Sequence, residues 1–391
     1  MNILFLTHRV PFPLDKGDRI RSYNIIKFLA NYHSISLMSV AHESTPADSY
    51  ENLRKFCATV QVFQINSQMS KLKSFFHLFS QNALTLPAFY SKRFHRAVKE
   101  KLQREAFDLV YIFSSPMAQY AMGERIPKIM DFIDVDSQKW LDYAARFSQP
   151  MKSVYYREGI RLRLFEKMVA GACDRSIFAS ERELNIFKDI VPDARMLAVP
   201  NGTDIHRQAT RPYRKNKLVF VGSMDYLPNI DAMTYFTREV LPLIRKEVPT
   251  VELMIVGRNP SRQMRLLGRL KGVTVTGAVD KIEPYLSDAA VSVIPLRIAR
   301  GIQNKILEAM AHGVPVVTTT AALEGIEALP ESEVLIGDDP RTFAEATLRL
   351  LKNKSMRQML AENARALVAE KYDWKENLQP LNELITELGV Q

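Results

Sequence analysis

Residues 291–318 decide the fold class, and they read VSVIPLRIARGIQNKILEAMAHGVPVVT. An apolar run of strand length, Val291–Pro295, ends in a polar loop. A helical segment follows at Lys305–Ala311, and a second apolar run covers Val314–Thr318. Continuous apolar runs are typical of parallel strands that are buried on both faces. The strand–helix–strand order therefore predicts a doubly wound α/β domain.

The same alternation extends in both directions from this segment. In the first half of the chain we expect strands at Ile3–Thr7, Ile35–Val40, Val60–Ile65, Leu109–Phe113, Ile129–Ile133 and Ser176–Ala179. In the second half we expect three more, at Leu218–Gly222, Leu253–Gly257 and Val273–Gly277. Helical segments such as Ile20–Ala30, Tyr155–Ala172 and Asp231–Lys246 separate the strands.

These patterns predict two doubly wound domains, residues 1–200 and residues 217–372. The stretch 201–216 is polar and interrupted by Gly and Pro, so we interpret it as a linker. Leucines recur at helical spacing near the end of the chain, which predicts a closing amphipathic helix at about 373–391. Two α/β domains in tandem imply a ligand cleft between them.

Composition argues against several classes of protein. The 391 residues are 47% hydrophobic and 25% charged, which argues against long disorder and against a coiled coil. Two cysteines do not make a disulfide framework, and the apolar start is too short for a secretory signal. No stretch approaches the roughly 20 apolar residues that span a bilayer. We therefore expect a cytoplasmic protein, with attachment to the inner face of the plasma membrane left open.

The net charge of +10 is unevenly distributed. Residues 1–200 hold 28 Lys and Arg against 20 Asp and Glu, whereas the remainder holds 25 against 23. Much of the surplus lies in residues 69–104, where basic residues alternate with aromatics such as Phe75 and Phe94. This pattern suits an anionic membrane surface, and it also suits nucleic acid. A third explanation is a pair of ordinary amphipathic helices whose aromatic rings lie in the core.

Three strand ends in the second half carry glycine, at Gly222, Gly257 and Gly277. Glycine at the carboxyl end of a parallel strand lets a ligand approach the backbone closely. A tight turn explains any one of these glycines taken alone. Three in one domain favour a ligand-binding edge.

Charged residues gather around the helix of the opening segment. Arg297, Arg300 and Gly301 precede the helix, and Lys305 and Glu308 share one of its faces. Helix N-termini favour phosphate, and Arg and Lys side chains add donors. A carboxylate accepts hydrogen bonds from sugar hydroxyls. A nucleoside diphosphate site and a solvated surface ion pair explain this pattern about equally well.

Several stretches together carry a family resemblance. They are Lys305–Val317 (KILEAMAHGVPVV), Phe220–Ser223, Val199–Asp204, Phe178–Glu181 and Tyr372–Trp374. These stretches resemble glycosyltransferase family 4, whose members are retaining enzymes of the GT-B fold. Lys16–Ser22, Asp131–Trp140 and Ala322–Ile326 are similar to a subgroup of sugar transferases associated with exopolysaccharide and exosortase (PEP-CTERM) clusters.

The resemblance implies a hexosyltransferase-type enzyme with two Rossmann-like domains and a C-terminal helix that returns to the first. It implies a nucleotide-sugar donor on the second domain, a glycan or lipid-linked acceptor on the first, and transfer with retention. The expected donor-binding residues are Gly17, Gly222, Ser223, Arg297, Arg300, Gly301, Lys305 and Glu308. The expected catalytic residues are Asp134, Asp136, Lys305 and Arg297. The two aspartates stand near the place where the family often has a histidine beside the transferred sugar.

The sequence also departs from the family pattern. Arg300 stands where the first of two acidic residues eight apart is expected, so only Glu308 remains. Ser223 and Pro228 stand where an Arg and a Lys are frequent. We therefore expect Arg297, Arg300 and Lys305 to share the binding of the diphosphate. No metal is expected, because none of the seven histidines has metal-ligand spacing and the basic groups can neutralise the leaving group.

Two other functions remain open. A GT-B nucleotide-sugar epimerase would use the same donor site and need no acceptor. A non-catalytic membrane or nucleic-acid binding protein would turn over no donor. The resemblance places nucleic acid last, so we expect an anionic membrane surface, contacted through residues 69–104, rather than a nucleic-acid partner.

Overall fold

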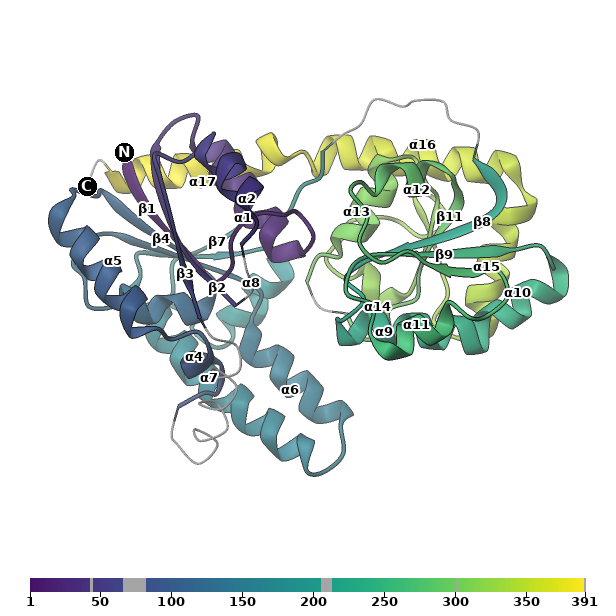
Figure 1. Ribbon diagram of the computed structural model, residues 1–391, viewed down its shortest axis with the longest axis horizontal. Helices are drawn as coiled ribbons and strands as arrows, with labels where there is room; N and C mark the ends of the chain where they lie inside the picture. Colours follow the sequence, from purple (N-terminus) through teal and green to yellow (C-terminus); the bar gives the residue numbers. More distant parts are fainter. Residues whose placement is uncertain (43–44, 66–81, 205–212, 300, 390–391) are drawn as a thin grey trace. The chain divides into compact units, whose positions relative to one another are not determined.

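The chain folds into two compact units, which the computed structural model shows in Figure 1. The first unit comprises Met1–Pro200 together with Leu378–Gln391, and the second comprises Asn201–Asn377. The structure describes all residues except 43–44, 66–81, 205–212, 300 and 390–391.

The first unit is built around a parallel sheet with the strand order β3-β2-β1-β4-β5-β6-β7 in the described part of the chain. The strands are β1 (Asn2–Thr7), β2 (Ser34–Ala41), β3 (Thr59–Gln64), β4 (Leu109–Phe113), β5 (Lys128–Ile133), β6 (Arg175–Phe178) and β7 (Met196–Ala198). The order reverses between β1 and β4. In doubly wound sheets, ligands bind outside the carboxyl ends of the strands at this reversal.

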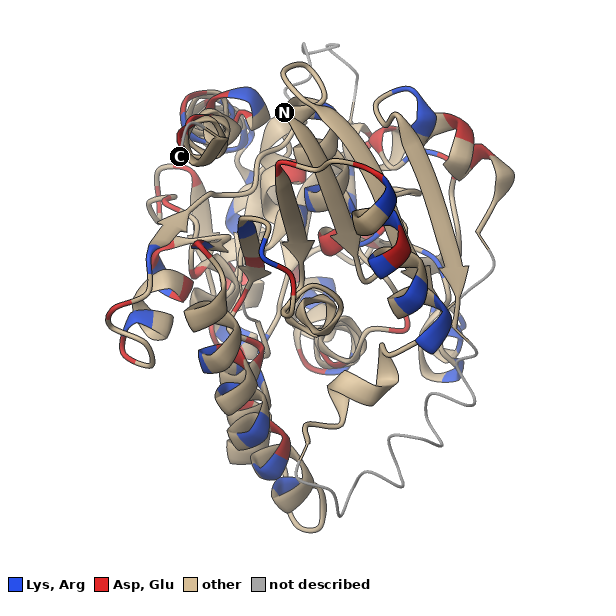
Figure 2. Ribbon diagram, turned by 90° about the vertical axis from the view of Figure 1, so that its left-hand side faces the viewer, with Lys and Arg blue, Asp and Glu red and all other residues tan. Residues whose placement is uncertain are grey.

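Helices pack on the two faces of this sheet (Figure 1). They are α1 (Gly17–Leu29), α2 (Ala47–Arg54), α4 (Thr85–Ala88), α5 (Lys92–Arg104), η2 (Ser115–Tyr120), α6 (Asp136–Arg146), α7 (Met151–Ala172) and α8 (Glu181–Lys188). Helices α6 and α7 form a hairpin that projects away from the sheet (Figure 2). The last helix, α17 (Trp374–Gly389), buries Leu378, Leu381 and Ile385, and its Asn382 Oδ1 lies 2.9 Å from Nε2 of His33. The closing helix therefore completes the first unit.

The second unit has a parallel sheet with the order β10-β9-β8-β11-β12-β13 among its described residues. The strands are β8 (Arg214–Val221), β9 (Glu252–Val256), β10 (Val273–Val275), β11 (Ala289–Ile294), β12 (Val316–Thr318) and β13 (Val334–Ile336). The helices are α9 (Leu227–Tyr235), η3 (Phe236–Val240), α10 (Leu241–Glu247), α11 (Arg262–Leu267), α12 (Glu283–Ser287), α13 (Asn304–Ala311), α14 (Thr320–Leu323), α15 (Pro340–Lys352) and α16 (Lys354–Lys371). Here the order reverses between β8 and β11.

The predicted doubly wound α/β architecture is confirmed in both units, with two additional short strands, β7 and β13. The helix expected over Asp231–Lys246 is wrong in detail. It is divided into α9, a π-helical turn (η3) and α10. Pro242 lies in the first turn of α10 and has no N–H to continue the hydrogen-bond ladder, which accounts for the break.

The linker differs from the predicted 201–216. Thr203 forms a β-bridge with Asp373, and a side chain on Gly202 would place its Cβ 2.8 Å from the backbone nitrogen of Trp374. Both residues belong to the second unit, which begins at Asn201. Strand β8 already starts at Arg214. Polarity made these flanking residues look like linker, although they belong to the second unit.

A buried ion pair joins distant parts of the first unit. The side chains of Arg21, in α1, and Asp131, in β5, are both fully buried, with an N–O distance of 3.2 Å. Arg21 also donates to the carbonyl of Val199 at 2.7 Å, and the Tyr111 hydroxyl donates to Asp131 at 2.8 Å. Burial, followed by the negative charge of Asp131, raises the pKa of Tyr111 well above its usual value. The network connects α1, β4, β5 and the segment after β7.

We expect Asp131→Ala to lower the free energy of unfolding by about 3–5 kcal/mol, because Arg21 would remain buried without its counter-ion. Urea unfolding followed by circular dichroism measures this change. The control is Lys352→Ala, which breaks a pair with Glu247 whose side chains are 55% and 56% exposed. Loss of such an exposed pair should change the free energy of unfolding far less. Equal effects of the two substitutions would contradict the structural role of the buried pair.

Candidate functional site

The carboxyl ends of β8 and β9 approach each other closely in the second unit. The N–H of Gly222 donates to the carbonyl of Val256 at 3.0 Å. A Cβ on Gly257 would lie 1.7 Å from the carbonyl oxygen of Gly222, so only glycine fits there. This contact brings the predicted donor-binding Gly222 and Ser223 to the edge where the strand order reverses.

Lys305 from α13 reaches the same edge. Its Nζ donates to Oδ1 of Asn229 at 2.5 Å and lies 4.6 Å from the ring centroid of Phe220, in β8. The amide of Asn229 in turn donates to the carbonyl of Ser223 at 2.9 Å. A Cβ on Gly222 would stand 2.7 Å from Nδ2 of Asn229 and 3.2 Å from Nζ of Lys305. The structure therefore brings Gly222, Ser223 and Lys305 together, with Asn229 as a partner that sequence reasoning missed.

The start of α13 provides backbone donors beside this amine. Its N-cap residue, Gln303, makes no side-chain capping bond, so the first N–H groups of the helix lack that partner. Among the described residues, the buried Nδ2 of Asn304 has no hydrogen-bond acceptor, while its Oδ1 accepts from Asn201 at 3.0 Å. Gly301 has a φ of 65° in the preceding loop, and Arg300 lies outside the described residues. Unpaired amides at a helix start suit an anion.

The surroundings of Lys305 and Glu308 shift the pKa of each group to about 7. Burial lowers the pKa of Lys305 to about 7, although the charge of Glu308 opposes the shift. Burial also raises the pKa of Glu308 to about 7, with Lys305 opposing the rise and Glu283 adding to it. The two groups are three residues apart on α13, so they influence each other directly. An incoming diphosphate would restore the charge of the lysine.

Arg297, expected to bind the diphosphate, has other partners in the structure. Its guanidinium makes a bidentate ion pair with Asp231, with distances of 3.0 and 2.6 Å, and stacks on Tyr235 at 4.6 Å. The hydrogen bond with Asp231 raises the pKa of Arg297. A diphosphate would have to compete with Asp231 for this side chain. No pattern in the sequence indicates this pairing, because 66 residues separate the partners.

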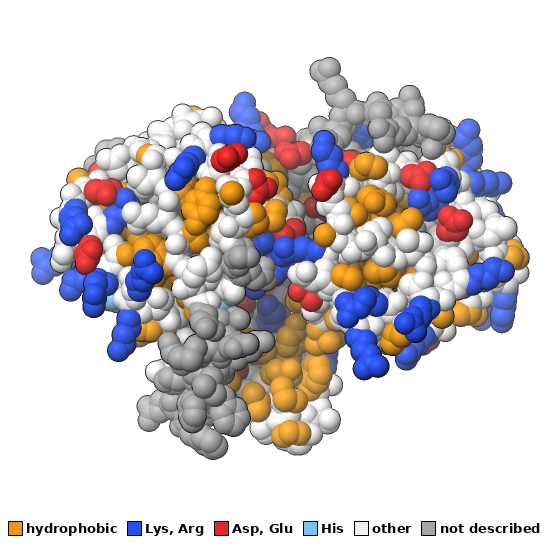
Figure 3. All heavy atoms as spheres, viewed as in Figure 1, with side chains coloured by type: hydrophobic (Ala, Val, Ile, Leu, Met, Phe, Trp, Pro, Cys, Tyr) orange, Lys and Arg blue, Asp and Glu red, His pale blue; other side chains and the backbone are white. Residues whose placement is uncertain are grey.

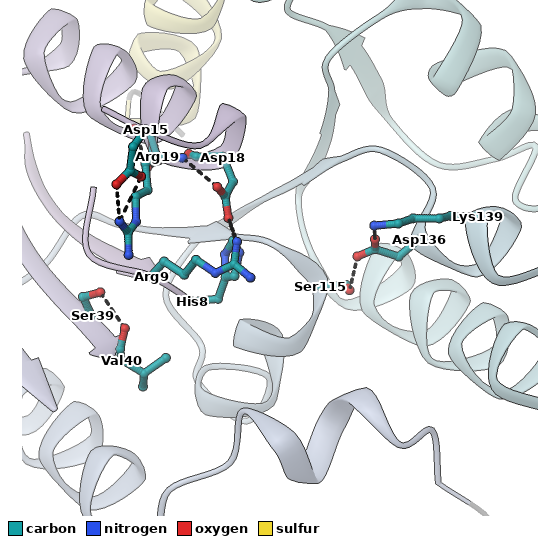
Figure 4. A network of polar contacts seen from close by, with 11 residues as sticks. His8, Arg9, Asp15, Asp18, Arg19, Ser39, Val40, Ser115, Asp136 and Lys139 are labelled. Carbon is teal, nitrogen blue, oxygen red and sulfur yellow. Dashed lines mark hydrogen bonds and ion pairs between the residues drawn. The ribbon is translucent and has the colours of Figure 1, made fainter. Parts of the chain in front are cut away.

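A polar cluster lies at the corresponding edge of the first unit (Figure 4). Asp18 Oδ2 lies 3.0 Å from Nε2 of His8 and accepts from Arg9 at 2.7 Å. Burial alone would raise the pKa of Asp18, but the contact with His8 and the charge of Arg9 lower it below its usual range. Asp18 follows Gly17, the first residue of α1. The expected donor-loop residue Gly17 therefore adjoins an ionised carboxylate that sequence reasoning had not paired with His8.

Asp134 and Asp136 follow β5 at the same edge. Ile133, at the end of β5, has a φ of 70°, and the N–H of Asp134 donates to the carbonyl of Phe132 at 2.9 Å. A β-branched residue in this conformation is strained. Asp136 begins α6, and its carboxylate accepts from Ser115 at 3.4 Å and lies 3.9 Å from Nζ of Lys139. Figure 4 shows Asp136 with Ser115 and Lys139 on one side and the His8 cluster on the other.

The basic segment 69–104 falls partly on residues 66–81, which lie outside the described residues. In the described remainder, the ring of Phe94 is fully buried, and Phe89 and Tyr90 pack against the core. Tyr90 stacks on Tyr120 with ring centroids 5.9 Å apart. For these aromatics the core explanation holds. Phe89 and Tyr90 remain partly exposed, so a membrane contact through residues 69–104 stays a prediction.

Residues 215–353 match the family model described as glycosyl transferases, group 1. The matched region contains β8, Lys305 and Glu308, the elements of the candidate donor site. The second unit therefore matches group 1 glycosyl transferases over the region that holds the candidate donor site, and the chain is an enzyme of the glycosyltransferase class. Among the described residues of the enzyme, no group of three His, Cys, Asp or Glu side chains could hold a metal ion.

Two curated relatives resemble the enzyme. An "uncharacterized 44.6 kDa protein in cps region" from Klebsiella pneumoniae is 20% identical over 95% of this chain and 97% of its own. A phosphatidyl-myo-inositol mannosyltransferase from Propionibacterium freudenreichii subsp. shermanii is 30% identical over 34% of each chain. The first similarity covers nearly the whole glycosyltransferase, whereas the second covers about a third of it.

Solved structures share the fold at low sequence identity. Sucrose-phosphate synthase from Thermosynechococcus elongatus superposes with a TM-score of 0.75 at 16% identity, covering 100% of both chains. HepE of Anabaena, in complex with UDP and glucose, gives a TM-score of 0.69 at 16% identity, over 99% of this chain and 100% of that one. The fold of the glycosyltransferase is GT-B, with two Rossmann-like α/β domains.

We expect Gly222→Ala to weaken binding of UDP by at least about tenfold, ~1.4 kcal/mol, because the added methyl displaces Asn229 and Lys305. Isothermal titration calorimetry with UDP and with GDP measures the loss. Gly171→Ala is the matched control, since a Cβ there meets nothing within 4 Å. Unchanged nucleotide affinity in Gly222→Ala would exclude this edge as the donor site.

The lowered pKa of Lys305 predicts a pH dependence of diphosphate binding. Affinity for UDP should be greatest below about pH 7, where the free lysine is protonated. It should fall by up to about tenfold per unit above that pH, because binding then requires proton uptake. Lys305→Arg stays charged over this range and serves as the control that isolates the lysine from the titration of the nucleotide. Equal pH slopes for the two proteins would contradict the assignment.

Proposed function

We propose that the enzyme transfers a sugar from a nucleoside diphosphate sugar to a glycan or lipid-linked acceptor in the synthesis of exopolysaccharide or cell envelope. The observation that carries the proposal is the position of the Lys305 amine. It lies between the glycine edge of β8 and the uncapped start of α13. A diphosphate is bound by a cationic side chain and by backbone amides. It also needs an edge where no side chain blocks its approach, which the glycines of β8 and β9 provide.

In the proposed mechanism, the leaving diphosphate is stabilised by fixed donors. Lys305 and the amides of α13 would neutralise the charge that develops on it, with Arg300 and Arg297 as further donors. Glu308 would accept hydrogen bonds from ribose hydroxyls. Asp134 and Asp136 would contact sugar hydroxyls or the acceptor. These groups would not need a metal, and retention of configuration rests on the resemblance to family 4.

The names of similar proteins support the choice of donor and pathway. The Anabaena structure contains UDP and glucose, which favours a UDP-sugar as the first donor to test. The Klebsiella relative belongs to a cps region, and the mannosyltransferase is named for a phosphatidylinositol acceptor. Both names suit an envelope glycan and an acceptor carried by a lipid. No described helix is both long and apolar enough to cross a membrane, so peripheral attachment is the form of membrane association that we propose.

The test is a panel of nucleotide sugars offered with a membrane lipid extract, read by nucleotide release and product mass. We expect one donor to release its nucleotide only when the extract is present, with and without a metal chelator. Lys305→Ala and Glu308→Ala should each lower the affinity for UDP and GDP by about tenfold or more. Lys271→Ala, an exposed lysine of the same unit, is the control.

Other outcomes separate the competing functions. Conversion of a donor to its epimer without nucleotide release would identify a nucleotide-sugar epimerase. Absence of turnover over the whole panel, with UDP and GDP bound equally by wild type, Lys305→Ala and Glu308→Ala, would contradict the proposed donor site.

A further inference from the structure

Helix α7 buries both of its acidic residues. Glu158 and Glu166 are 3% and 0% exposed. Glu158 accepts hydrogen bonds from the backbone of Leu84 and Thr85 at 2.6 and 2.9 Å, and Glu166 accepts one from the N–H of Ser137 at 3.1 Å. These carboxylates therefore bind backbone amides inside the unit. All 22 residues of α7 are described, and the outward face of the helix carries no carboxylate.

The outward face of α7 is apolar instead. Tyr156, Ile160, Leu164 and Met168 recur every four residues, so they form a row along one side of the helix. Their exposed fractions are 58%, 38%, 64% and 56%. Single exposed apolar residues are ordinary on a protein surface, but a continuous row marks an interaction surface. Figure 3 shows apolar side chains gathered over the α6–α7 hairpin.

Basic residues border this row. Lys152 and Lys167 are exposed on α7. Arg157 and Arg161 are half-buried and donate to the carbonyl of Asn82 at 3.3 and 3.4 Å, so their guanidinium groups are held near the row. With both acids buried, the charged side chains of α7 that remain accessible are all positive. Lys and Arg stems also pack along apolar surface while their heads remain in a polar layer.

Helix α7, which carries this face, packs tightly against α6. Gly159 of α7 packs against α6 so closely that a Cβ would lie 2.7 Å from Cγ of Leu141 and 2.9 Å from the carbonyl of Ser137. The rings of Trp140 and Tyr155 also pack against each other in a tilted arrangement, with centroids 5.5 Å apart. The hairpin projects away from the sheet (Figures 1 and 2). A projecting, well-packed pair of helices suits contact with an extended surface.

We propose that the outer face of α7, formed by Tyr156, Ile160, Leu164 and Met168 with Lys152 and Lys167, docks the enzyme on an anionic lipid bilayer. Apolar side chains would enter the boundary of the acyl chains, and the lysines would attract the headgroups. Phosphate backbones of nucleic acid need the cations but not the apolar row. The docking deepens the proposed function, which has a lipid-linked acceptor, and it places the membrane contact on α7 rather than on residues 69–104.

Co-sedimentation of the full chain with vesicles tests this docking. We expect the protein to bind vesicles of phosphatidylcholine mixed with phosphatidylglycerol, and to bind phosphatidylcholine alone weakly. The double variant Leu164→Ser with Met168→Ser should lower binding to the mixed vesicles by at least about tenfold. The matched control is Leu329→Ser in the second unit, because Leu329 is 65% exposed and Leu164 is 64% exposed. Equal binding of the double variant and wild type would overturn the proposal.

A second variant tests the charge separately. Lys152→Glu with Lys167→Glu should reduce binding to the mixed vesicles and flatten its dependence on salt. Affinity for UDP, measured without vesicles, should be the same in all these variants. Urea unfolding followed by circular dichroism should match that of wild type, which shows that the first unit is folded. Loss of vesicle binding in these variants, with intact UDP binding, would support the docking and would not bear on the proposed donor site. Vesicle binding by a wild type that binds no nucleotide would overturn only the proposed function.

Other occupants of the face would give different results. A wild-type dimer that binds no vesicles and dissociates in the Leu164→Ser, Met168→Ser variant would assign the face to a second copy of the chain. Duplex DNA that displaces the protein from vesicles at equal phosphate concentration would assign it to polyanions in general. Either result overturns lipid docking.

Discussion

The first unit depends on the ion pair between Arg21 and Asp131. A charge buried without a partner costs several kcal/mol, so this pair fixes where α1 and β5 lie relative to each other. The start of α1 carries Gly17 and Asp18, and the end of β5 leads to Asp134. Both groups of candidate residues in this unit are therefore positioned by a contact that lies one layer beneath them.

In the second unit, a close backbone contact rather than a charge pair positions the candidate residues. Gly222 and Gly257 meet so closely that no side chain fits between them, which leaves the approach to the edge of β8 open. Lys305 then enters from α13 and is held by Asn229. Because burial lowers its pKa, the empty site does not have to carry a full positive charge, and the ligand restores it on binding.

Much of the fold was predictable from the sequence, because buried parallel strands are continuous apolar runs. The short strands β7 and β13 were missed, since three residues carry too little pattern. In the candidate site, the sequence indicated that Gly222, Lys305 and Glu308 belong together through their place at strand and helix ends. It did not predict the contact of His8 with Asp18 or the pairing of Arg297 with Asp231, because such contacts follow from side-chain packing. For the same reason, the sequence alone does not decide whether Phe94 points into the core.

The path of the chain has a consequence for biosynthesis. The first unit consists of Met1–Pro200 and Leu378–Gln391, so the entire second unit is inserted within it. Helix α17 buries Leu378, Leu381 and Ile385 in that first unit. During translation, the apolar surface of residues 1–200 that α17 covers therefore stays exposed while nearly half of the chain is still being made. Completion of the first unit is a late event, and a ribosome that stalls within the second unit leaves a nascent chain that chaperones can recognise.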